Sequence, residues 1–491
     1  MLDPMRTQTN WRLPRIAVLA AVAAMSMATV RAQADRYELG LRLRAWERKL
    51  DATQDAAKRK AAFAELDKAV QAFFGMNLNG VAEAVGKADA ALDGRERDNA
   101  ELWAERLVLK LPQRLCDPTA GDAAAQLESL RYGREEEPPT KPEGAVFLAS
   151  IDGQEALRCD IAELPMAISL PLRERKDGDF ALAWRIESNG RVLASREQGL
   201  SIAAGRDARL AAFDALDAER SGVEEQPSIE RETLTALVRM LRGMTKARSE
   251  ETILPGARLL REAEAVAASL AGDAAGAFYD KARSGQFWLR VPTARGPVHV
   301  RIAVPKAAAE GKPLPLAFAL HGAGGSENLF FDGYGDGAIV RLCEERNMLL
   351  CAPRTAGMSG ADLPALLDAL AARYPIDRSR VVLVGHSMGA MQAVAQASAS
   401  PSTFCAVAAL GGGGNARKSV GLAKLPFFVA AGERDFGRAQ AKRLSEQLQG
   451  LCDDATYRDY ADVEHLAIVQ VALPDVFAFF DRCCKEPNRA K

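Results

Sequence analysis

The sequence lacks an excess of either charge. Its 64 lysines and arginines balance 65 aspartates and glutamates, for a net charge of −1. Proteins that bind nucleic acid through its phosphates carry a basic surface, so the composition does not indicate a nucleic-acid partner. A zinc site is equally unsupported, because the eight cysteines include no C-x-x-C pair and the four histidines are too few beside them.

Long apolar segments are also missing after the first 34 residues, whereas a membrane-spanning helix needs about 20 apolar residues in a row. Residues 1–34 resemble an export signal. Three arginines precede the apolar run 16–30, and Ala32-Gln33-Ala34 offers small residues at the two positions that a signal peptidase reads. We therefore expect a cleaved signal peptide and a periplasmic or extracellular protein, with an uncleaved anchor as the alternative. Export would permit disulfides, whose pairing the sequence does not reveal.

The 491 residues suggest two or three domains. Alanine is abundant in residues 35–143, and apolar residues recur there at spacings of three and four, which predicts a helical region. Residues 144–205 follow a group of prolines and read as a small β-rich module, with a hairpin signal at Asn189-Gly190. Helical patterns return over residues 206–284. We identify no chemical motif in these three regions.

Residues 285–485 alternate strands with helices, a pattern that predicts a mostly parallel sheet. Runs such as VVLV and FFVAA are continuously apolar, as strands buried on both faces are. The expected strands are 286–292, 297–305, 315–321, 348–353, 380–385, 405–410, 426–431 and 455–460. The expected helices are near 335–346, 361–373, 388–399, 438–450 and 472–482.

A G-x-S-x-G motif, Gly385-His386-Ser387-Met388-Gly389, stands between the strand RVVLVG and a helical stretch. This context is typical of a nucleophile elbow, a sharp turn on which the serine side chain stands out above the sheet. The glycines would allow helix and strand to approach closely. Ser387 is therefore the candidate nucleophile.

A serine hydroxyl needs a base near neutral pH. In this order of elements the base follows both the serine and its acid, which leaves His465 among the four histidines. We expect the side chain of His386 to point elsewhere. Asp435 follows the strand PFFVAAG and is the best candidate for the acid; Glu433 is the main alternative and Asp462 the third.

Acyl transfer also needs backbone N–H groups that meet the developing oxyanion. One should come from Met388, which follows the nucleophile, and the second from the loop HGAGG at 321–325. Ala323 is our choice for the second donor and Gly322 the next, and we also expect Gly322 to contact substrate. Just beyond this loop, Phe331 and Tyr334, with Phe330, could line an acyl or aromatic pocket, although ordinary core packing is an equal alternative for the phenylalanines.

The motifs LHGAGG, GHSMGA, GERD and DVEHL resemble the α/β-hydrolase superfamily, and within it secreted esterases grouped with polyhydroxybutyrate depolymerases, feruloyl esterases and prolyl-oligopeptidase-like peptidases. The resemblance implies an eight-stranded, mostly parallel sheet whose first strands are antiparallel. It also implies a covalent acyl-enzyme and no metal or organic cofactor. Many relatives insert a helical lid where this chain has Gly411 to Gly414, which suggests a mobile rim instead.

Our leading hypothesis is a serine hydrolase of carboxylic esters, acting on a small-molecule or polymer ester. A peptidase of prolyl-oligopeptidase type is the second hypothesis, because the same three residues would serve both reactions. The third is an inert binding or scaffold protein, against which the filled Ser387, Asp435 and His465 positions argue.

Overall fold

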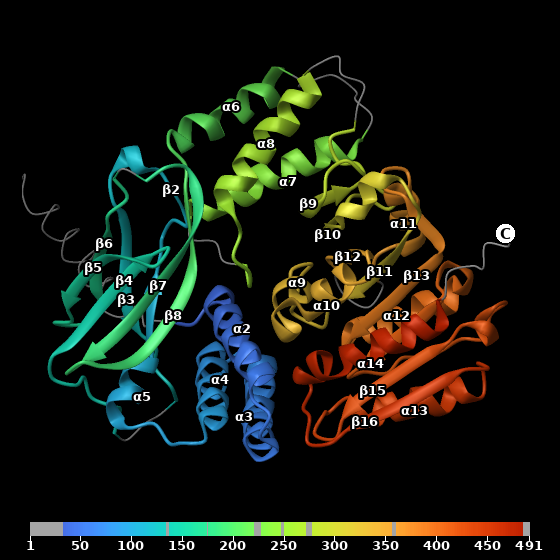
Figure 1. Cartoon of the computed structure of the whole chain (residues 1–491), viewed down its shortest axis with the longest axis horizontal. Helices are drawn as coiled ribbons and strands as arrows, with labels where there is room; N and C mark the ends of the chain where they lie inside the picture. The colour runs from blue at the N-terminus through green and yellow to red at the C-terminus, as the bar shows by residue number, and fades with distance from the viewer. Residues whose placement is uncertain are drawn as a thin grey trace, which may run out of the picture.

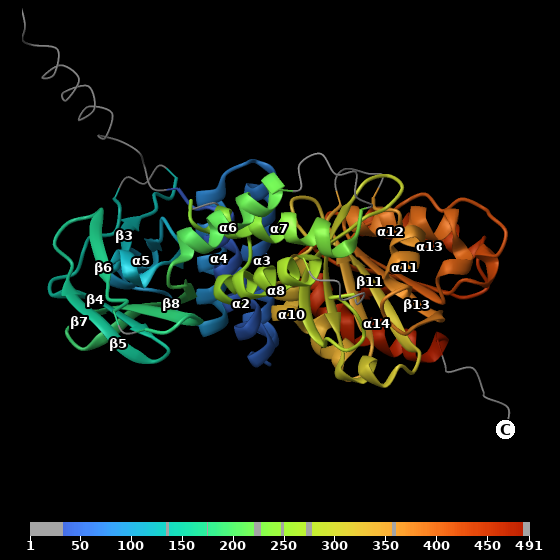
Figure 2. The same ribbon diagram turned by 90° about the horizontal axis from the view of Figure 1, so that it is seen from above.

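The computed structural model describes residues 33–133, 137–173, 175–219, 227–246, 250–271, 277–355 and 360–484. A β-rich module lies at one end of the molecule and a large α/β domain at the other, with two groups of helices between them (Figures 1 and 2). The predicted signal peptide lies outside the described residues except for its last two. Within the described residues, no helix is both long and apolar enough to cross a membrane.

The first group of helices is α2 (Arg36–Ala52), α3 (Ala56–Phe74) and α4 (Leu78–Asp93). Each begins after a polar side chain, Asp35, Asp55 or Asn77, which accepts a backbone N–H of the first turn and so stabilises the helix start. A short helix, α5 (Asn99–Glu105), follows. The buried faces of α2–α4 share one hydrophobic core with a face of the large sheet.

The β-rich module contains a three-stranded sheet in the order β1-β3-β6 and a five-stranded sheet in the order β2-β8-β7-β4-β5, which share a core. Its strands are β1 (Leu107–Lys110), β2 (Leu115–Cys116), β3 (Ala123–Ser129), β4 (Ala145–Ile151), β5 (Gln154–Asp160), β6 (Met166–Leu170), β7 (Gly178–Ser188) and β8 (Arg191–Ile202).

The prediction of helix throughout residues 35–143 is therefore wrong for 107–129. In β3, Ala123, Ala125 and Leu127 are buried while the residues between them are exposed. The favourable cross-strand packing of this alternating face outweighs the helix preference of alanine.

The second group of helices is α6 (Arg206–Glu219), α7 (Ile229–Met244) and α8 (Gly256–Ala271). Their apolar residues, such as Leu237, Leu241 and Leu260, belong to the core on the opposite face of the large sheet from α2–α4. The two groups of helices thus continue the two layers that cover the sheet.

The large sheet has eight strands in the order β16-β15-β14-β13-β11-β12-β10-β9. They are β9 (Gly285–Val291), β10 (Val298–Val304), β11 (Leu314–Leu320), β12 (Leu349–Pro353), β13 (Ile376–His386), β14 (Ala406–Leu410), β15 (Phe427–Gly432) and β16 (Ala455–Tyr460). β10 pairs antiparallel with β9 and with β12, and the remaining pairs are parallel. This strand order is that of the α/β-hydrolase fold.

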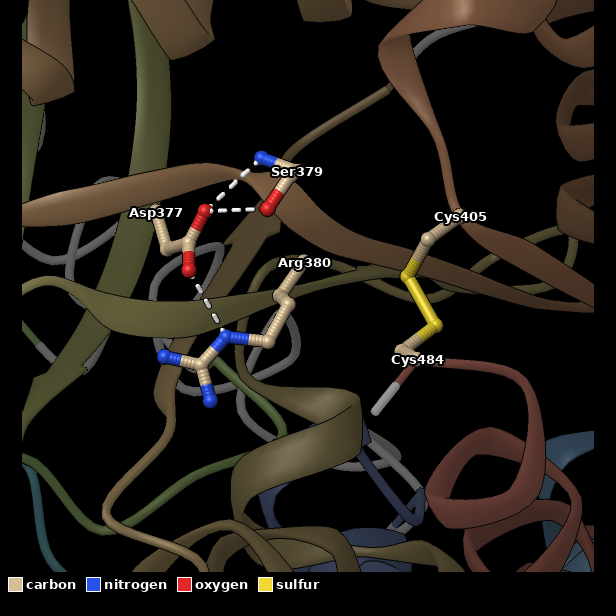
Figure 3. Close-up of a disulfide and its surroundings, with 5 residues drawn as sticks. All are labelled: Asp377, Ser379, Arg380, Cys405 and Cys484. Atoms are coloured by element: carbon tan, nitrogen blue, oxygen red, sulfur yellow. Dashed lines mark hydrogen bonds and ion pairs between the residues drawn. A yellow bond between two sulfur atoms is a disulfide. The ribbon is translucent and has the colours of Figure 1, made fainter. Parts of the chain in front are cut away.

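The helices of this domain are α9 (Leu329–Asp332), α10 (Tyr334–Glu344), α11 (Leu363–Ala371), α12 (Met388–Ala399), α13 (Arg438–Gln449) and α14 (Ala467–Cys483). A disulfide joins Cys405, just before β14, to Cys484, which follows the last residue of α14 (Figure 3). The other six cysteines are free. The disulfide ties the last helix to the centre of the sheet.

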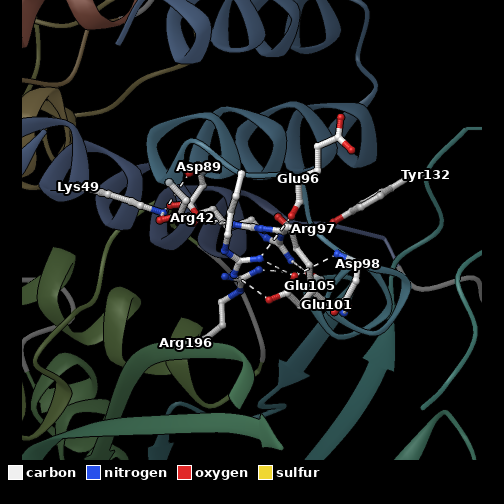
Figure 4. Close-up of polar contacts among 12 residues, drawn as sticks. Arg42, Lys49, Asp89, Glu96, Arg97, Asp98, Glu101, Glu105, Tyr132 and Arg196 are labelled. Carbon is white, nitrogen blue, oxygen red and sulfur yellow. Dashed lines mark hydrogen bonds and ion pairs between the residues drawn. The ribbon is translucent and has the colours of Figure 1, made fainter. Parts of the chain in front are cut away.

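A buried polar cluster fastens the first helices to the β-rich module (Figure 4). The backbone carbonyl of Glu105 accepts hydrogen bonds from Arg42 of α2 at 3.0 Å and from Arg196 of β8 at 3.2 Å. Arg97 forms ion pairs with Asp89 of α4 and with the Glu105 carboxylate. Buried charges that lose one partner are costly, so this cluster fixes α2 and α4 against the module.

Candidate active site

Ser387 stands on the turn between β13 and α12. Its backbone has φ 56° and ψ −115°, a positive-φ conformation that is strained for a residue with a side chain. Glycine is required at positions 385 and 389, because backbone carbonyl oxygens lie where a Cβ would be. A Cβ on Gly385 would lie 2.1 Å from the Gly389 carbonyl oxygen, and one on Gly389 would lie 2.0 Å from the Leu320 carbonyl oxygen.

The structure brings together the three side chains that the sequence nominates. His465 Nε2 lies 2.9 Å from Ser387 Oγ, and His465 Nδ1 lies 2.7 Å from Asp435 Oδ1. Asp435 and His465 are 5% and 3% exposed, so water competes little for this contact. A carboxylate can only accept, so Nδ1–H donates to Asp435 and Nε2 is left to accept the serine proton.

The alternative acids do not reach the imidazole. Glu433 is exposed, and its carboxylate accepts the backbone N–H of Asp462 at 3.3 Å. Asp462 forms an ion pair with Lys60 of α3 at 2.9 Å. Asp435 Oδ1, by contrast, also accepts the Gly437 N–H at 2.6 Å, which holds the carboxylate in place.

His386 has a place in the site that the sequence reasoning missed. Its Nε2 lies 2.8 Å from the backbone carbonyl of His465, which can only accept, so Nε2 carries the proton. Its Nδ1 then accepts from the Tyr334 hydroxyl, 2.6 Å away. Complete burial holds the pKa of His386 well below its usual value and keeps the ring neutral. The sequence offers no signal for this role, because Tyr334 lies 52 residues away.

The two predicted oxyanion donors lie at the serine. Met388 is the first residue of α12, where a backbone N–H has no partner within the helix. Across from it, a Cβ on Gly322 would lie 3.2 Å from the Ser387 Cβ, so the 321–325 loop adjoins the nucleophile. The Gly322 N–H points to the Tyr334 hydroxyl at 3.4 Å. This arrangement favours Ala323, the next residue of the turn, as the second donor.

A cavity of about 160 Å³ opens beside Ser387 and His465. Gly322 and Tyr334 line it, as the sequence predicts for substrate-binding residues. Phe331 does not, and neither does Phe330. Both rings are buried in the core, and the Arg301 guanidinium lies 4.6 Å from the centre of the Phe331 ring. The prediction that Phe331 contacts substrate is therefore wrong.

The prediction of a mobile rim at Gly411 to Gly414 is also wrong. The first three of these glycines are buried. A Cβ on Gly411 would lie 2.8 Å from Asp435 Oδ2, and one on Gly412 would lie 2.6 Å from the Ser387 carbonyl oxygen. The glycines are there because the backbone packs directly behind the catalytic turn, which a larger residue would displace.

Comparison with known proteins agrees with these motifs. The family model described as "Putative esterase" matches residues 363–442, which include the elbow and Asp435. No curated protein matches the chain.

Solved structures with a similar domain include the S-formylglutathione hydrolase of Agrobacterium tumefaciens, at 17% identity over 43% of this chain and 97% of that chain, with a TM-score of 0.34. Another is a feruloyl esterase module of Clostridium thermocellum, at 14% identity over 43% of this chain and 91% of that chain, with a TM-score of 0.36. A carboxylesterase cloned from a metagenomic library has 14% identity over 42% of this chain and 90% of that chain, with a TM-score of 0.32.

Proposed function

We propose that this chain is an esterase-type serine hydrolase of the α/β-hydrolase superfamily and cleaves carboxylic esters through an acyl-enzyme on Ser387, which the matching family model and the strand order support. His465 takes the proton of the serine hydroxyl as Oγ attacks the ester carbonyl, and returns it to the departing alcohol. A water molecule then repeats the sequence on the acyl-enzyme, with His465 again as the base. Asp435 holds the imidazole in the tautomer that this requires.

The backbone N–H groups of Met388 and Ala323 stabilise the negative charge that builds on the carbonyl oxygen in both halves of the reaction. The residues named supply the nucleophile, the base and the oxyanion donors, so the steps proposed here use no metal or organic cofactor.

A single observation carries the proposal: the unbroken hydrogen-bonded line from Ser387 Oγ through both ring nitrogens of His465 to Asp435. The two contacts, at 2.9 and 2.7 Å, are within the range in which a proton can transfer without a large rearrangement.

The proposal can be tested by comparing the rates at which the protein hydrolyses an ester and peptide amides. We expect the purified protein to hydrolyse p-nitrophenyl butyrate, and to act at least a thousandfold more slowly on p-nitroanilides of proline-containing peptides. The reverse preference would make the protein a peptidase. Absence of turnover on both, with no labelling by a fluorophosphonate, would support an inert scaffold.

We also propose that the protein is exported. The basic, apolar and small-residue sequence of residues 1–34 supports this, as does the disulfide between Cys405 and Cys484, which persists in oxidising compartments. Mass spectrometry of the protein recovered outside the cytoplasm tests it. Ala34 is 2% exposed and its N–H donates to Asn79 Oδ1 at 2.8 Å. The mass of the recovered chain also shows whether Ala34 stays in the mature protein or is removed with the signal peptide. Recovery of only the full-length chain from the cytoplasm would contradict export.

A further inference from the structure

The cavity beside Ser387 has two walls that lie far apart in the sequence. One wall belongs to the hydrolase domain and includes Ser387, His465 and the loop 322–325. The other belongs to helices α2, α3 and α4, which end at Asp93, far before β9 begins at Gly285, and come to lie beside that domain in the molecule (Figure 1). Residues of α2–α4 thus line the same cavity as Ser387 and His465.

The helical wall is largely apolar, with Arg36 and Arg44 of α2 as its charged residues. The apolar side chains that it presents to the cavity include Leu43, Ala69, Val70, Phe73, Val81 and Val85. Such a surface gains free energy by removing an apolar group from water, at about 25 cal/mol per Å² of buried area. These six side chains offer no hydrogen bond to a polar group, so burying one against them would be costly.

The charged residues around the cavity are paired with the protein itself. Arg36 forms an ion pair with Glu251 at 2.8 Å, and Arg44 pairs with Asp336 at 3.0 Å. Asp332 binds a buried arginine of β10 through both carboxylate oxygens. A charged substrate group would therefore lose its hydration without gaining a ready counter-ion.

The end of α3 contacts the catalytic machinery directly. A Cβ on Gly324, in the oxyanion loop, would lie 2.5 Å from the Phe73 ring, so the two surfaces touch. The Phe74 ring lies edge-on to Phe436 with 5.8 Å between centres, and the Phe436 ring lies 4.0 Å from that of His465. Phe74 and Phe436 are each 55% exposed, so they form an apolar surface beside His465, and Phe74 also lines the cavity.

The helices are held at this position by polar contacts on two sides. The carboxylate of Glu47 in α2 accepts the Asp336 N–H at 3.1 Å, and its backbone carbonyl accepts from Gln470 at 3.0 Å. Lys60 of α3 pairs with Asp462, in the loop before His465. A wall fixed in this way has a defined shape and can discriminate between acyl groups.

We propose that helices α2–α4 form the acyl-binding wall of the active site and select esters of an uncharged, apolar acyl group about the size of a benzene ring or a six-carbon chain. A cavity of about 160 Å³ is close to the roughly 150 Å³ engineered cavity that holds benzene. The inference rests on the proposed ester hydrolysis.

The acyl side of the ester is the side that meets these helices. The carbonyl carbon must lie between Ser387 and the oxyanion loop, and that loop lines the cavity together with α2–α4. The substituent on this carbon therefore extends into the cavity, whereas the leaving alcohol must stay within reach of His465 Nε2.

A series of p-nitrophenyl esters tests the size and charge of the acyl group. We expect kcat/KM to rise at least tenfold from acetate to hexanoate and benzoate, and to fall at least tenfold again at dodecanoate. The mono-p-nitrophenyl ester of adipic acid matches hexanoate in length but carries a carboxylate, and should be at least tenfold slower. Equal rates along the series, or a preference for the charged ester, would overturn the inference.

Two substitutions in α3 test whether the helical wall makes the choice. Val70→Phe fills the cavity and should lower the hexanoate-to-acetate ratio of kcat/KM at least tenfold. Phe73→Ala enlarges it and should raise the dodecanoate-to-hexanoate ratio at least fivefold. The control is Phe63→Ala in the same helix, because Phe63 is 3% exposed, packs against Trp46 and does not line the cavity. Its ratios should stay within twofold of the wild type.

The outcomes separate this inference from the proposed function. A wild-type protein that hydrolyses none of the esters and is not labelled by a fluorophosphonate contradicts ester hydrolysis itself. Suppose that the protein is active but neither Val70→Phe nor Phe73→Ala changes its ratios of kcat/KM between esters, or that Phe63→Ala changes them equally. Either result contradicts only the role of the helices. The ester series decides the size preference even where a variant fails to fold.

Discussion

The hydroxyl of Tyr334 lies 2.6 Å from Nδ1 of His386, and this contact links the two sides of the active site. Tyr334 receives the N–H of Gly322 in the oxyanion loop, and His386 donates to the backbone carbonyl of His465. One continuous set of hydrogen bonds therefore runs behind Ser387, from the loop that meets the oxyanion to the residue that carries the base.

We predict that Tyr334→Phe lowers kcat by about tenfold while KM changes by less than threefold, because the oxyanion loop and His465 lose their common anchor. The unpaired Nδ1 of His386 should also lower the free energy of unfolding by about 1–3 kcal/mol. Steady-state kinetics and urea unfolding measure the two effects.

The matched control is Tyr374→Phe. Tyr374 is 3% exposed, and its hydroxyl has no hydrogen-bond partner among the described residues. Its removal should leave kcat unchanged and the stability equal or higher. A Tyr334→Phe enzyme with normal kcat would show that the linkage does not position the site.

Two substitutions of a carboxylate by an amide test whether Asp435 or Glu433 is the acid that orients His465. Asp435→Asn should lower kcat by about 10⁴-fold, because the amide no longer holds His465 in the tautomer whose Nε2 accepts the serine proton. Glu433→Gln, which changes an exposed neighbour, should leave kcat within twofold. Initial rates on p-nitrophenyl butyrate decide the matter, and a large loss in Glu433→Gln alone would assign the acid to that residue instead.

Two buried carboxyl groups predict how stability depends on pH. Burial raises the pKa of Glu464, which precedes His465, to about 8, and that of Glu47 in α2 to about 8, both from an ordinary value of 4.5. The folded state then holds protons that the unfolded state has released, so the free energy of unfolding falls as the pH rises through this window.

The range from pH 7.5 to 8.5 suits this test, because His386 is neutral in the folded state and the histidines of the unfolded chain, with a pKa of about 6.5, are then mostly deprotonated as well. We expect urea unfolding to show stability falling over this range in the wild type and a shallower fall in Glu464→Gln. Glu446→Gln, which alters an exposed side chain of α13, should follow the wild type. Stability that rises with pH from 7.5 to 8.5 would contradict the protonated carboxyls.

The disulfide should contribute strongly to stability, because Cys405 and Cys484 close a loop of 79 residues. Loop-closure entropy for this length amounts to about 4 kcal/mol. A Cys405→Ala, Cys484→Ala variant should lose about that much in unfolding free energy. Dithiothreitol should lower the melting temperature of the wild type but not of the variant, and equal melting temperatures without reductant would contradict the linkage.

The catalytic half of the molecule was predictable from its sequence because its signals are local. The second half of β13 and the whole of β15 are continuously buried runs, and the glycines around Ser387 stand where a Cβ would strike the backbone. The order of serine, acid and histidine along the chain then restricted the base to His465.

Other features depend on contacts between distant residues, and the sequence could not supply them. The helices α2–α4 were predicted, yet their place beside Ser387 depends on contacts such as Glu47 with Asp336, 289 residues apart. Strand β3 was missed because its alternating pattern consists largely of alanine, a residue that favours helix. Phe331 was wrongly predicted to contact substrate. Its neighbours on α9, Leu329 and Asp332, line the cavity, but its own ring packs in the core.

The nucleophile is the centre of this account, and Ser387→Ala tests it most directly. The account predicts that a fluorophosphonate adds one label to the wild-type protein, on the peptide that contains Ser387, and none to the variant. It also predicts that turnover of p-nitrophenyl butyrate by the variant falls by about four orders of magnitude or more. A folded Ser387→Ala protein that keeps near-normal turnover, or is labelled as the wild type is, would contradict it.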